Sequence, residues 1–335
     1  MFITCVHFLF LKGKNTNMAM GQELELKFGN QIVTLKLGKE LGRGAFGTVS
    51  LAVNPITNKS YAVKRSQCID ADTCHAAAAE IEALITLDHP NIAKMNAFDF
   101  LENSAVIVME YCEGGDLNQR LSRKVDDGKK LEWINQIFDA IIYLHSKGIV
   151  HRDLKPENVL ISNDALKLTD FGISCFYKRN TMGENNLSEF LGTFAGTPYW
   201  VAPEVFDHRY TETADVFSVG VLCYAILLQE SMQHEGKNYF GIFVQENNQR
   251  KVGLGLAMFQ ENREIQPPTR YEGSLEINDM VCGLVKRDPL QRLPLEDSKK
   301  IVMKVLDSKK EQNMSWMQWF NLKSRSYTGG YCNLL

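Results

Sequence analysis

A glycine-rich turn between two β-strand patterns is the feature that most constrains how this chain can fold. The stretch GRGAFG, from Gly42 to Gly47, has the GxGxxG spacing that lets backbone N–H groups approach phosphate oxygens. In a dinucleotide-binding fold, such glycines open a helix. Here, apolar and polar residues alternate over 48–53, NPITNK then marks a turn, and SYAVKR resumes the strand pattern. The glycines are therefore expected to join strands of a sheet.

Two periodicities divide the chain into a strand-rich first part and a helical second part. From about residue 32 to 108, strand patterns are interrupted by one helix, HAAAAEIEALITL, which Asp70 and Asp72 can cap. Beyond about residue 116, apolar residues recur at helical spacing, as in LEWINQIFDAIIYLH. With 335 residues and 44% apolar content, the chain is long enough for a large core in two lobes.

Charge and cysteine content limit the classes of partner and compartment. The formal net charge of −3, from 37 basic and 40 acidic residues, argues against a protein that coats nucleic acid or an anionic membrane. Eight cysteines lack the paired spacing of zinc sites, so we expect the cytoplasm or nucleus rather than secretion. The apolar start MFITCVHFLFL lacks a preceding positive charge, which favours an extension or an early start codon over a signal peptide.

The stretch HRDLKPENVLI, from His151 to Ile161, fixes an Asp, a Lys and an Asn at short steps before an apolar run. Surface loops carry charge but rarely end in such a run, so a strand must anchor this loop. Asp-Phe-Gly follows at 170–172 and Ala-Pro-Glu at 202–204. Each motif is weak alone, since a glycine-rich hairpin or a charged loop has bland explanations. Their order and spacing together make coincidence very unlikely.

These motifs, with Lys64 in AVK, make the chain resemble the eukaryotic protein kinase family over roughly residues 35 to 305. The resemblance implies a bilobal α+β fold: a small β-rich N-lobe with one key helix, and a larger helical C-lobe. We place the N-lobe at 32–111 and the C-lobe at 112–305. An N-terminal extension, 1–31, and a C-terminal tail, 306–335, would flank them. Asp215 and Arg292 stand where the family has two buried anchors.

The resemblance also implies a site that binds ATP and Mg²⁺. In it, Asp153 would accept a hydrogen bond from the substrate hydroxyl, and Lys155 would neutralise charge on the transferred group. Asn158 and Asp170 would hold the magnesium ions, which prefer oxygen ligands. Thr197 would hydrogen-bond Asp153 and Lys155.

Lys64, held by Glu80, would bind the α- and β-phosphates of the nucleotide. The backbone of Glu110 and Cys112 would contact the adenine, with Met109 behind it. The full set of expected nucleotide-site residues is Leu41, Gly42, Gly44, Gly47, Val49, Ala62, Lys64, Glu80, Met109, Glu110, Cys112 and Leu160.

Lys155 and the Gly196-Thr197 pair are typical of kinases that act on serine and threonine, whereas tyrosine kinases usually carry Ala or Arg in that loop. A dual-specificity kinase, a pseudokinase scaffold and a small-molecule kinase on the same fold remain as alternatives. The complete set of catalytic residues disfavours the scaffold, and the segment GTPYWVAPE, which resembles a peptide-docking platform, disfavours a small-molecule substrate. Thr193 is a candidate for activating phosphorylation.

Two stretches, YCEGGDLNQRLSRK and FAGTPYWVAPEVFDHRYTETADVFSVGV, are similar to a small kinase branch that binds PDZ-LIM proteins of the actin cytoskeleton. Phe217 stands where most kinases have Trp, and that branch tolerates the substitution. We therefore expect a protein substrate with Ser or Thr, with cytoskeletal or PDZ-LIM partners, and no binding to nucleic acid or membrane.

Overall fold

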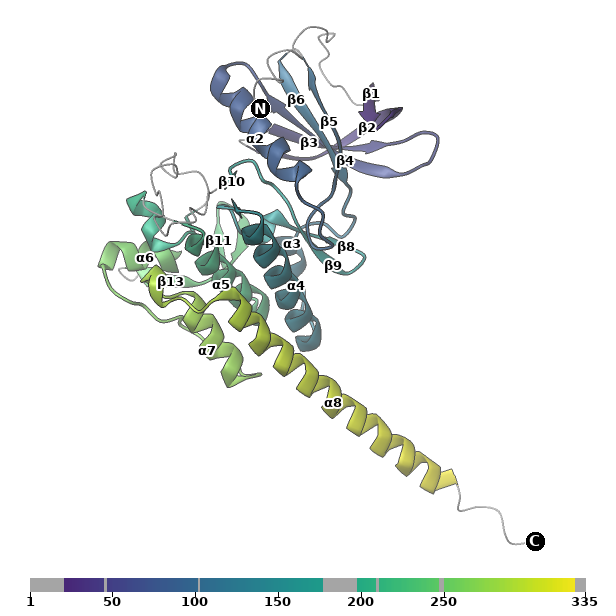
Figure 1. Cartoon of the computed structure of the whole chain (residues 1–335). Coiled ribbons are helices and arrows are strands. Elements are labelled where there is room, and N and C mark those ends of the chain that lie inside the picture. Colours follow the sequence, from purple (N-terminus) through teal and green to yellow (C-terminus); the bar gives the residue numbers. More distant parts are fainter. Residues whose placement is uncertain are drawn as a thin grey trace, which may run out of the picture.

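A sheet-rich lobe and a helical lobe make up the computed structural model, which describes residues 21–44, 47–101, 103–176, 198–208, 211–246 and 250–328 (Figure 1). The first lobe is a six-stranded sheet in the order β1-β2-β3-β4-β6-β5. The expected α+β class, with a small β-rich lobe and a larger helical one, is confirmed. The strands of the sheet are β1 (Glu23–Phe28), β2 (Gln31–Gly44), β3 (Gly47–Val53), β4 (Ser60–Gln67), β5 (Met95–Leu101) and β6 (Ser104–Glu110).

The sheet begins earlier than residue 32, where we placed the start of the domain. β1 lies inside the segment 1–31 that we assigned to an extension, and it pairs antiparallel with β2 from Glu23↔Lys36 to Phe28↔Gln31. Leu24 and Leu26 of β1 are buried in the core of this lobe. The last part of the expected extension is therefore a structural strand.

The one helix of the sheet-rich lobe, α2 (Ala71–Ile85), lies beside the sheet (Figure 1). Asp70 caps it as expected: its side chain accepts from the Thr73 N–H, and Thr73 bonds back to the Asp70 N–H in a capping box. Asp72 lies in the first turn instead, where its negative charge interacts favourably with the positive end of the helix dipole.

Apolar helices form the core of the second lobe. The central helix α5 (Thr213–Leu228) is buried along almost its whole length, and it packs against α4 (Asp127–Ser146) and α7 (Leu275–Leu284). Two short strands, β8 (Val159–Ser162) and β9 (Ala165–Leu168), pair antiparallel and anchor the charged loop of the HRDLKPEN motif. The remaining elements here are α3 (Leu117–Leu121), β7 (Ile149–Val150), η1 (Pro156–Asn158), β10 (Cys175–Phe176), η3 (Pro203–Asp207), α6 (Leu254–Glu261) and η4 (Pro289–Gln291).

The segment after α5 folds into two short hairpins before α6. They are β11 (Ser231–His234) with β12 (Lys237–Phe240), and β13 (Phe243–Glu246) with β14 (Arg250–Gly253). Gly253, at the end of β14, packs closely on the backbone of Tyr199, and Gly255 of α6 packs on that of Val201. The second hairpin and α6 therefore support the segment before the Ala-Pro-Glu motif.

The last helix, α8 (Leu295–Thr328), includes most of the segment 306–335 that we expected to be a tail. It starts against α4 and α7 and runs away from the body of the molecule (Figure 1). In the described part of the chain, α8 included, no helix combines the length and apolar character needed to cross a bilayer.

Candidate active site

Three charged side chains that are far apart in the sequence meet where the two lobes join. The Lys64 ammonium lies 2.6 Å from Glu80 Oε1 and 2.9 Å from Asp170 Oδ1. Lys64 is 5% exposed and Glu80 is 3% exposed. β4 supplies the lysine, α2 the glutamate, and the Asp-Phe-Gly segment the aspartate. The predicted Lys64–Glu80 pair is thus formed, and it ties α2 to the sheet.

Electrostatics keep this lysine charged. Burial alone would lower the pKa of the Lys64 ammonium, but the carboxylates of Asp170 and Glu80 outweigh burial and raise that pKa. Burial likewise opposes the charge of Asp170, yet the Lys64 ammonium lowers the pKa of its carboxyl below the ordinary value. The site therefore presents a fixed cation beside a fixed anion at neutral pH.

Asp153, Lys155 and Asn158 form a second cluster on the loop that precedes β8. The Lys155 ammonium donates to Asp153 Oδ2 over 2.7 Å. Asn158 Nδ2 donates to the same oxygen over 2.9 Å and to the Asp153 carbonyl over 2.8 Å. The buried Asp153 carboxylate is thus held from two sides, as a group that must aim at a hydroxyl requires. The Thr169 N–H donates to the Asn158 carbonyl over 2.9 Å, which joins this cluster to Asp170.

Asp215 of α5 holds the backbone of the loop that carries Asp153. Its two carboxylate oxygens accept from the N–H groups of His151 and Arg152 over 2.8 and 2.9 Å. His145 Nε2 lies 2.9 Å from the same carboxylate. Arg152 has φ of +72°, an unfavourable conformation for a residue with a Cβ, so these bonds compensate for local strain. The expectation that Asp215 is a buried anchor is confirmed.

His151 joins the loop to the Asp-Phe-Gly segment. Its ring packs against Phe171 with the ring centroids 5.0 Å apart. Its Nε2 lies 3.0 Å from the Thr169 carbonyl. Asp170, between these two contacts, has φ of +62°, which turns its carboxylate toward Lys64. The strained backbone conformation is therefore at Asp170, whose carboxylate must point toward Lys64.

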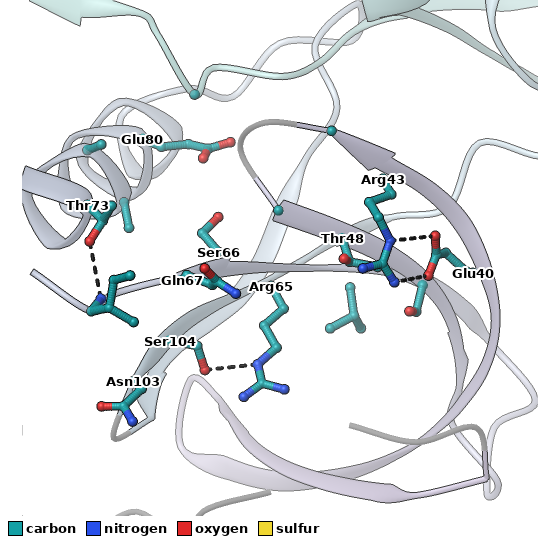
Figure 2. Close-up of a pocket in the computed structure, with 18 residues that line it drawn as sticks. Glu40, Arg43, Thr48, Arg65, Ser66, Gln67, Thr73, Glu80, Asn103 and Ser104 are labelled. Atoms are coloured by element: carbon teal, nitrogen blue, oxygen red, sulfur yellow. Dashed lines mark hydrogen bonds and ion pairs between the residues drawn. The ribbon is translucent and has the colours of Figure 1, made fainter. Parts of the chain in front are cut away.

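The glycine turn closes over this region. Gly42 pairs with Val49, and Gly44 with Gly47, as β2 turns into β3. Gly47 has φ of +128°, and a Cβ there would lie 2.1 Å from the Arg65 carbonyl oxygen, so only glycine fits. The turn and α2 also border a cavity of about 810 Å³, which Glu80 lines (Figure 2). Its other walls include Thr48 and Arg65 rather than Val49 and Lys64, so it lies on the other face of β3 and β4 from the expected nucleotide contacts. Leu41 is partly exposed at the end of this β-ribbon.

Four residues expected to lie around adenine, Ala62, Met109, Glu110 and Cys112, are on β4 and at the end of β6. Ala62 of β4 pairs with the buried Met109 of β6. Cys112 is buried just beyond β6, and burial raises the pKa of its thiol to about 12, so it is an inert side chain. The Glu110 N–H donates to the Lys94 carbonyl, so any contact of the Glu110 backbone with a base must use its carbonyl. Leu160 of β8 is partly buried.

One contact near the expected adenine site had no signal in the sequence. Lys167 of β9 lies opposite Leu160, and its ammonium is 2.9 Å from Glu110 Oε1. This ion pair links the end of β6 to the β8–β9 hairpin. The alternation Leu166-Lys167-Leu168 could have shown that Lys167 faces away from the core, but not which carboxylate it meets.

The side-chain oxygens of Asn158 and Asp170 suit a magnesium ion that a nucleotide also binds. Asn158 uses its amide nitrogen on Asp153, and Asp170 uses Oδ1 on Lys64. Each side chain has another oxygen to offer, and oxygen ligands suit this cation. Among the described residues, no group of three or more His, Cys, Asp and Glu side chains could hold a metal by itself. A magnesium ion held by Asn158 and Asp170 would complete its shell with water and phosphate oxygens.

Arg292 fixes the Ala-Pro-Glu segment against the helical lobe. Its guanidinium binds both carboxylate oxygens of Glu204 at 2.6 and 2.7 Å and donates to the Thr213 carbonyl over 2.7 Å. The same guanidinium lies 5.1 Å above the ring of Phe217. Arg292, the second predicted anchor, is therefore confirmed as buried. Phe217, at the position where most kinases have Trp, packs on the Arg292 guanidinium. Thr193 and Thr197 lie outside the described residues, as do Ala45 and Phe46 of the glycine turn.

Comparison with known proteins agrees with this geometry. A family model described as the protein kinase domain matches residues 35–312. The chain is 33% identical to Aurora kinase A-A of Xenopus laevis over 268 residues, which are 78% of this chain and 60% of the relative. It is 34% identical to calcium-dependent protein kinase 4 of Arabidopsis thaliana over 274 residues, or 78% of this chain and 50% of the relative. A probable myosin light chain kinase of Dictyostelium discoideum is 37% identical over 205 residues, or 57% of this chain and 62% of the relative. The chain thus spans between half and two thirds of these relatives.

Proposed function

Because the chain belongs to the protein kinase family, we propose that it transfers the γ-phosphate of ATP to serine and threonine hydroxyls of proteins. The observation that carries the proposal is the carboxylate of Asp153, held by Lys155 and Asn158 beside the cluster of Lys64, Glu80 and Asp170. Phosphoryl transfer depends mainly on positioning and charge neutralisation, and these fixed groups supply both.

Each side chain has a task that follows from its position. Asp153 accepts the hydrogen bond of the substrate hydroxyl and aims its oxygen at the phosphorus. Lys155, 2.7 Å from that carboxylate, lies where charge on the transferred group must be neutralised. Lys64 orients the phosphates, and Glu80 orients Lys64. Asn158 and Asp170 would hold magnesium, which would neutralise further phosphate charge.

The preference for serine and threonine rests on Lys155 and the Gly196-Thr197 pair. Lys155 is within hydrogen-bonding distance of the base, which supports its direct part in the reaction. A dual-specificity kinase is the second candidate, because the same residues do not exclude a tyrosine hydroxyl. Phosphoamino-acid analysis of a labelled protein substrate separates the two: phosphoserine and phosphothreonine alone support our proposal, and phosphotyrosine in comparable amount contradicts it.

A pseudokinase scaffold is the competing class. Such proteins lack one of the catalytic groups, whereas Lys64, Asp153 and Asp170 are present here and in contact with their partners. The test is incubation of the purified full chain with radiolabelled ATP, magnesium and a generic protein substrate. We expect transfer that is lost when magnesium is chelated. No label above that chelated control would identify a scaffold.

For partners, we propose protein substrates of the actin cytoskeleton, including PDZ-LIM proteins. The support is the similarity of YCEGGDLNQRLSRK and the stretch around the Ala-Pro-Glu motif to that kinase branch, and the name of the Dictyostelium relative, which refers to myosin. Retention of PDZ-LIM proteins on the immobilised chain, and not on a matched unrelated kinase, tests this. Equal retention on both would contradict it.

For location, we propose the cytoplasm or nucleus. The support is the set of free cysteines at positions 68, 74, 112, 223 and 282, a pattern typical of reducing compartments. Imaging of the tagged full chain in cells is the test, and a secretory-pathway pattern would contradict the proposal.

A further inference from the structure

The segment 199–201, just before the Ala-Pro-Glu motif, runs beside the loop that carries Asp153. Ser218 Oγ of α5 donates to the Trp200 carbonyl over 2.8 Å. On the same helix and one turn earlier, Asp215 holds the backbone of that loop. Positions three apart on a helix share a face, so one face of α5 holds both the segment and the loop. A polypeptide that presents a hydroxyl to Asp153 therefore passes close to this segment.

The first hairpin, β11 with β12, packs on this segment through aromatic rings. The Tyr239 ring centroid lies 5.4 Å from that of Tyr199 and 6.0 Å from that of Trp200. The His234 ring centroid lies 6.2 Å from that of Tyr199. Trp200 Nε1 donates to the Phe240 carbonyl over 2.9 Å, and Trp200 is 2% exposed. Aromatic pairs at these separations stabilise beyond the area they bury, so the hairpin fixes both rings of the segment.

The second hairpin, β13 with β14, approaches the backbone of the same segment. The Phe243 ring meets the Tyr199 ring edge-on, with the centroids 5.8 Å apart. A Cβ at Gly253 would lie 2.6 Å from Tyr199 Cα and 2.7 Å from its carbonyl oxygen. A real Cβ does not come this close to backbone atoms, so glycine is what lets the end of β14 lie against the segment. The two hairpins thus hold the segment through both its rings and its backbone.

The first hairpin also contacts α3, which borders the loop that carries Asp153. Asn118 Nδ2 of α3 donates to the Asn238 carbonyl of β12 over 2.8 Å. Asp116, the N-cap of α3, pairs with Leu160 of β8 in an isolated β-bridge, and α3 packs on η1 of the same loop. The hairpin therefore joins two elements that border the site, α3 and the segment 199–201.

We propose that the two hairpins position the segment 199–201 to receive the protein substrate, and that Tyr239 is the main positioning residue. Tyr239 acts through Tyr199 and Trp200. Without its ring the segment adopts other conformations, and only the fraction in the receiving conformation binds substrate. The KM for protein substrate then rises, while the turnover of bound substrate stays the same. The effect on phosphate transfer rests on the proposed function, whereas the effect on the order of the segment does not.

Hydrogen exchange of the full chain measures the order of the segment independently of activity. In Tyr239→Ala, peptides that cover 199–202 should exchange about fivefold faster than in wild type, because two ring contacts are lost. His234→Ala removes one exposed ring, leaves the core intact, and should show a smaller increase. Tyr239→Phe keeps the ring, and Lys237→Ala changes an exposed residue of the same hairpin, so both should match wild type. Wild-type exchange in Tyr239→Ala and His234→Ala would overturn the proposal.

Steady-state kinetics of the same variants tests the link to substrate. For Tyr239→Ala, the KM for a generic protein substrate should rise about fivefold, with turnover and the KM for ATP within about twofold of wild type. Tyr239→Phe should restore the wild-type KM. Faster exchange with an unchanged KM for protein, or an equal rise in the KM for ATP, would overturn the proposal. A wild-type chain without transfer would overturn the proposed function and the role in substrate binding, while the exchange result would still decide whether the hairpins order the segment.

Discussion

At the scale of single residues, the site depends on a few side chains and glycines whose replacement by other amino acids would destabilise the fold. Asp215 is the clearest case, because one buried carboxylate accepts from two backbone N–H groups of the catalytic loop and contacts His145. Gly47 is another, because the neighbouring Arg65 carbonyl leaves no room for a Cβ. The consequences of changing each can be predicted separately.

Asp215→Asn should lower the free energy of unfolding by about 2–4 kcal/mol, since charge-assisted bonds to buried N–H groups are lost. The pKa of the Asp215 carboxyl is lowered because the His145 contact and backbone N–H groups overcome the cost of burial. A carboxyl with a lowered folded pKa stabilises the fold above its ordinary value of 3.8, and this contribution is lost as pH falls through the folded value. Denaturant titrations of both proteins between neutral and acid pH measure this. A variant as stable as wild type at neutral pH would contradict the prediction.

Gly47→Ala should destabilise the protein by about 1–3 kcal/mol, because alanine disfavours φ of +128° and its Cβ would meet the Arg65 carbonyl. Gly44→Ala is the matched control, since a Cβ there has no neighbour within 4 Å and its φ is not positive. Thermal unfolding without nucleotide isolates the backbone effect from contact with phosphate. Equal changes in the two variants would show that Gly47 is not constrained in this way.

At the scale of elements, local signals explain what the sequence could predict. The cap of α2, the glycine turn between β2 and β3, and the strand after HRDLKPEN all depend on neighbouring residues, and all are where the sequence placed them. The hairpin of β11 and β12 was missed because its strands are polar. Its turn at Glu235-Gly236, with both φ values positive, is a two-residue hairpin turn of a type that favours glycine.

The cap of α2 gives a prediction at this scale. Asp70→Ala removes the acceptor for the Thr73 N–H and should cost about 1 kcal/mol. Asp72→Ala is the control, because Asp72 contributes only its charge in the first turn and should cost roughly half as much or less. Chemical denaturation measures both, and a larger loss for Asp72→Ala would contradict the assigned cap.

At the scale of the whole molecule, contacts between distant segments make the site, and those had to be observed. Sequence motifs named Lys64, Glu80, Asp153 and Asp170, and the resemblance to kinases assigned their pairing. The ion pair of Lys167 with Glu110 depends on how separate elements pack, which residue spacing does not encode. The same holds for β1, whose place depends on pairing with β2.

The central claim is that Asp153 is the group that positions the substrate hydroxyl for transfer, and its most direct test is the turnover of Asp153→Asn. The substitution keeps the size of the side chain, so nucleotide binding, measured by calorimetry, should change by less than about threefold. Turnover on a protein substrate should fall by a factor of about 10² to 10⁴, because the base and its orientation are lost. A variant that retains more than about a tenth of wild-type turnover, a loss below ~1.4 kcal/mol in transition-state stabilisation, would contradict the account.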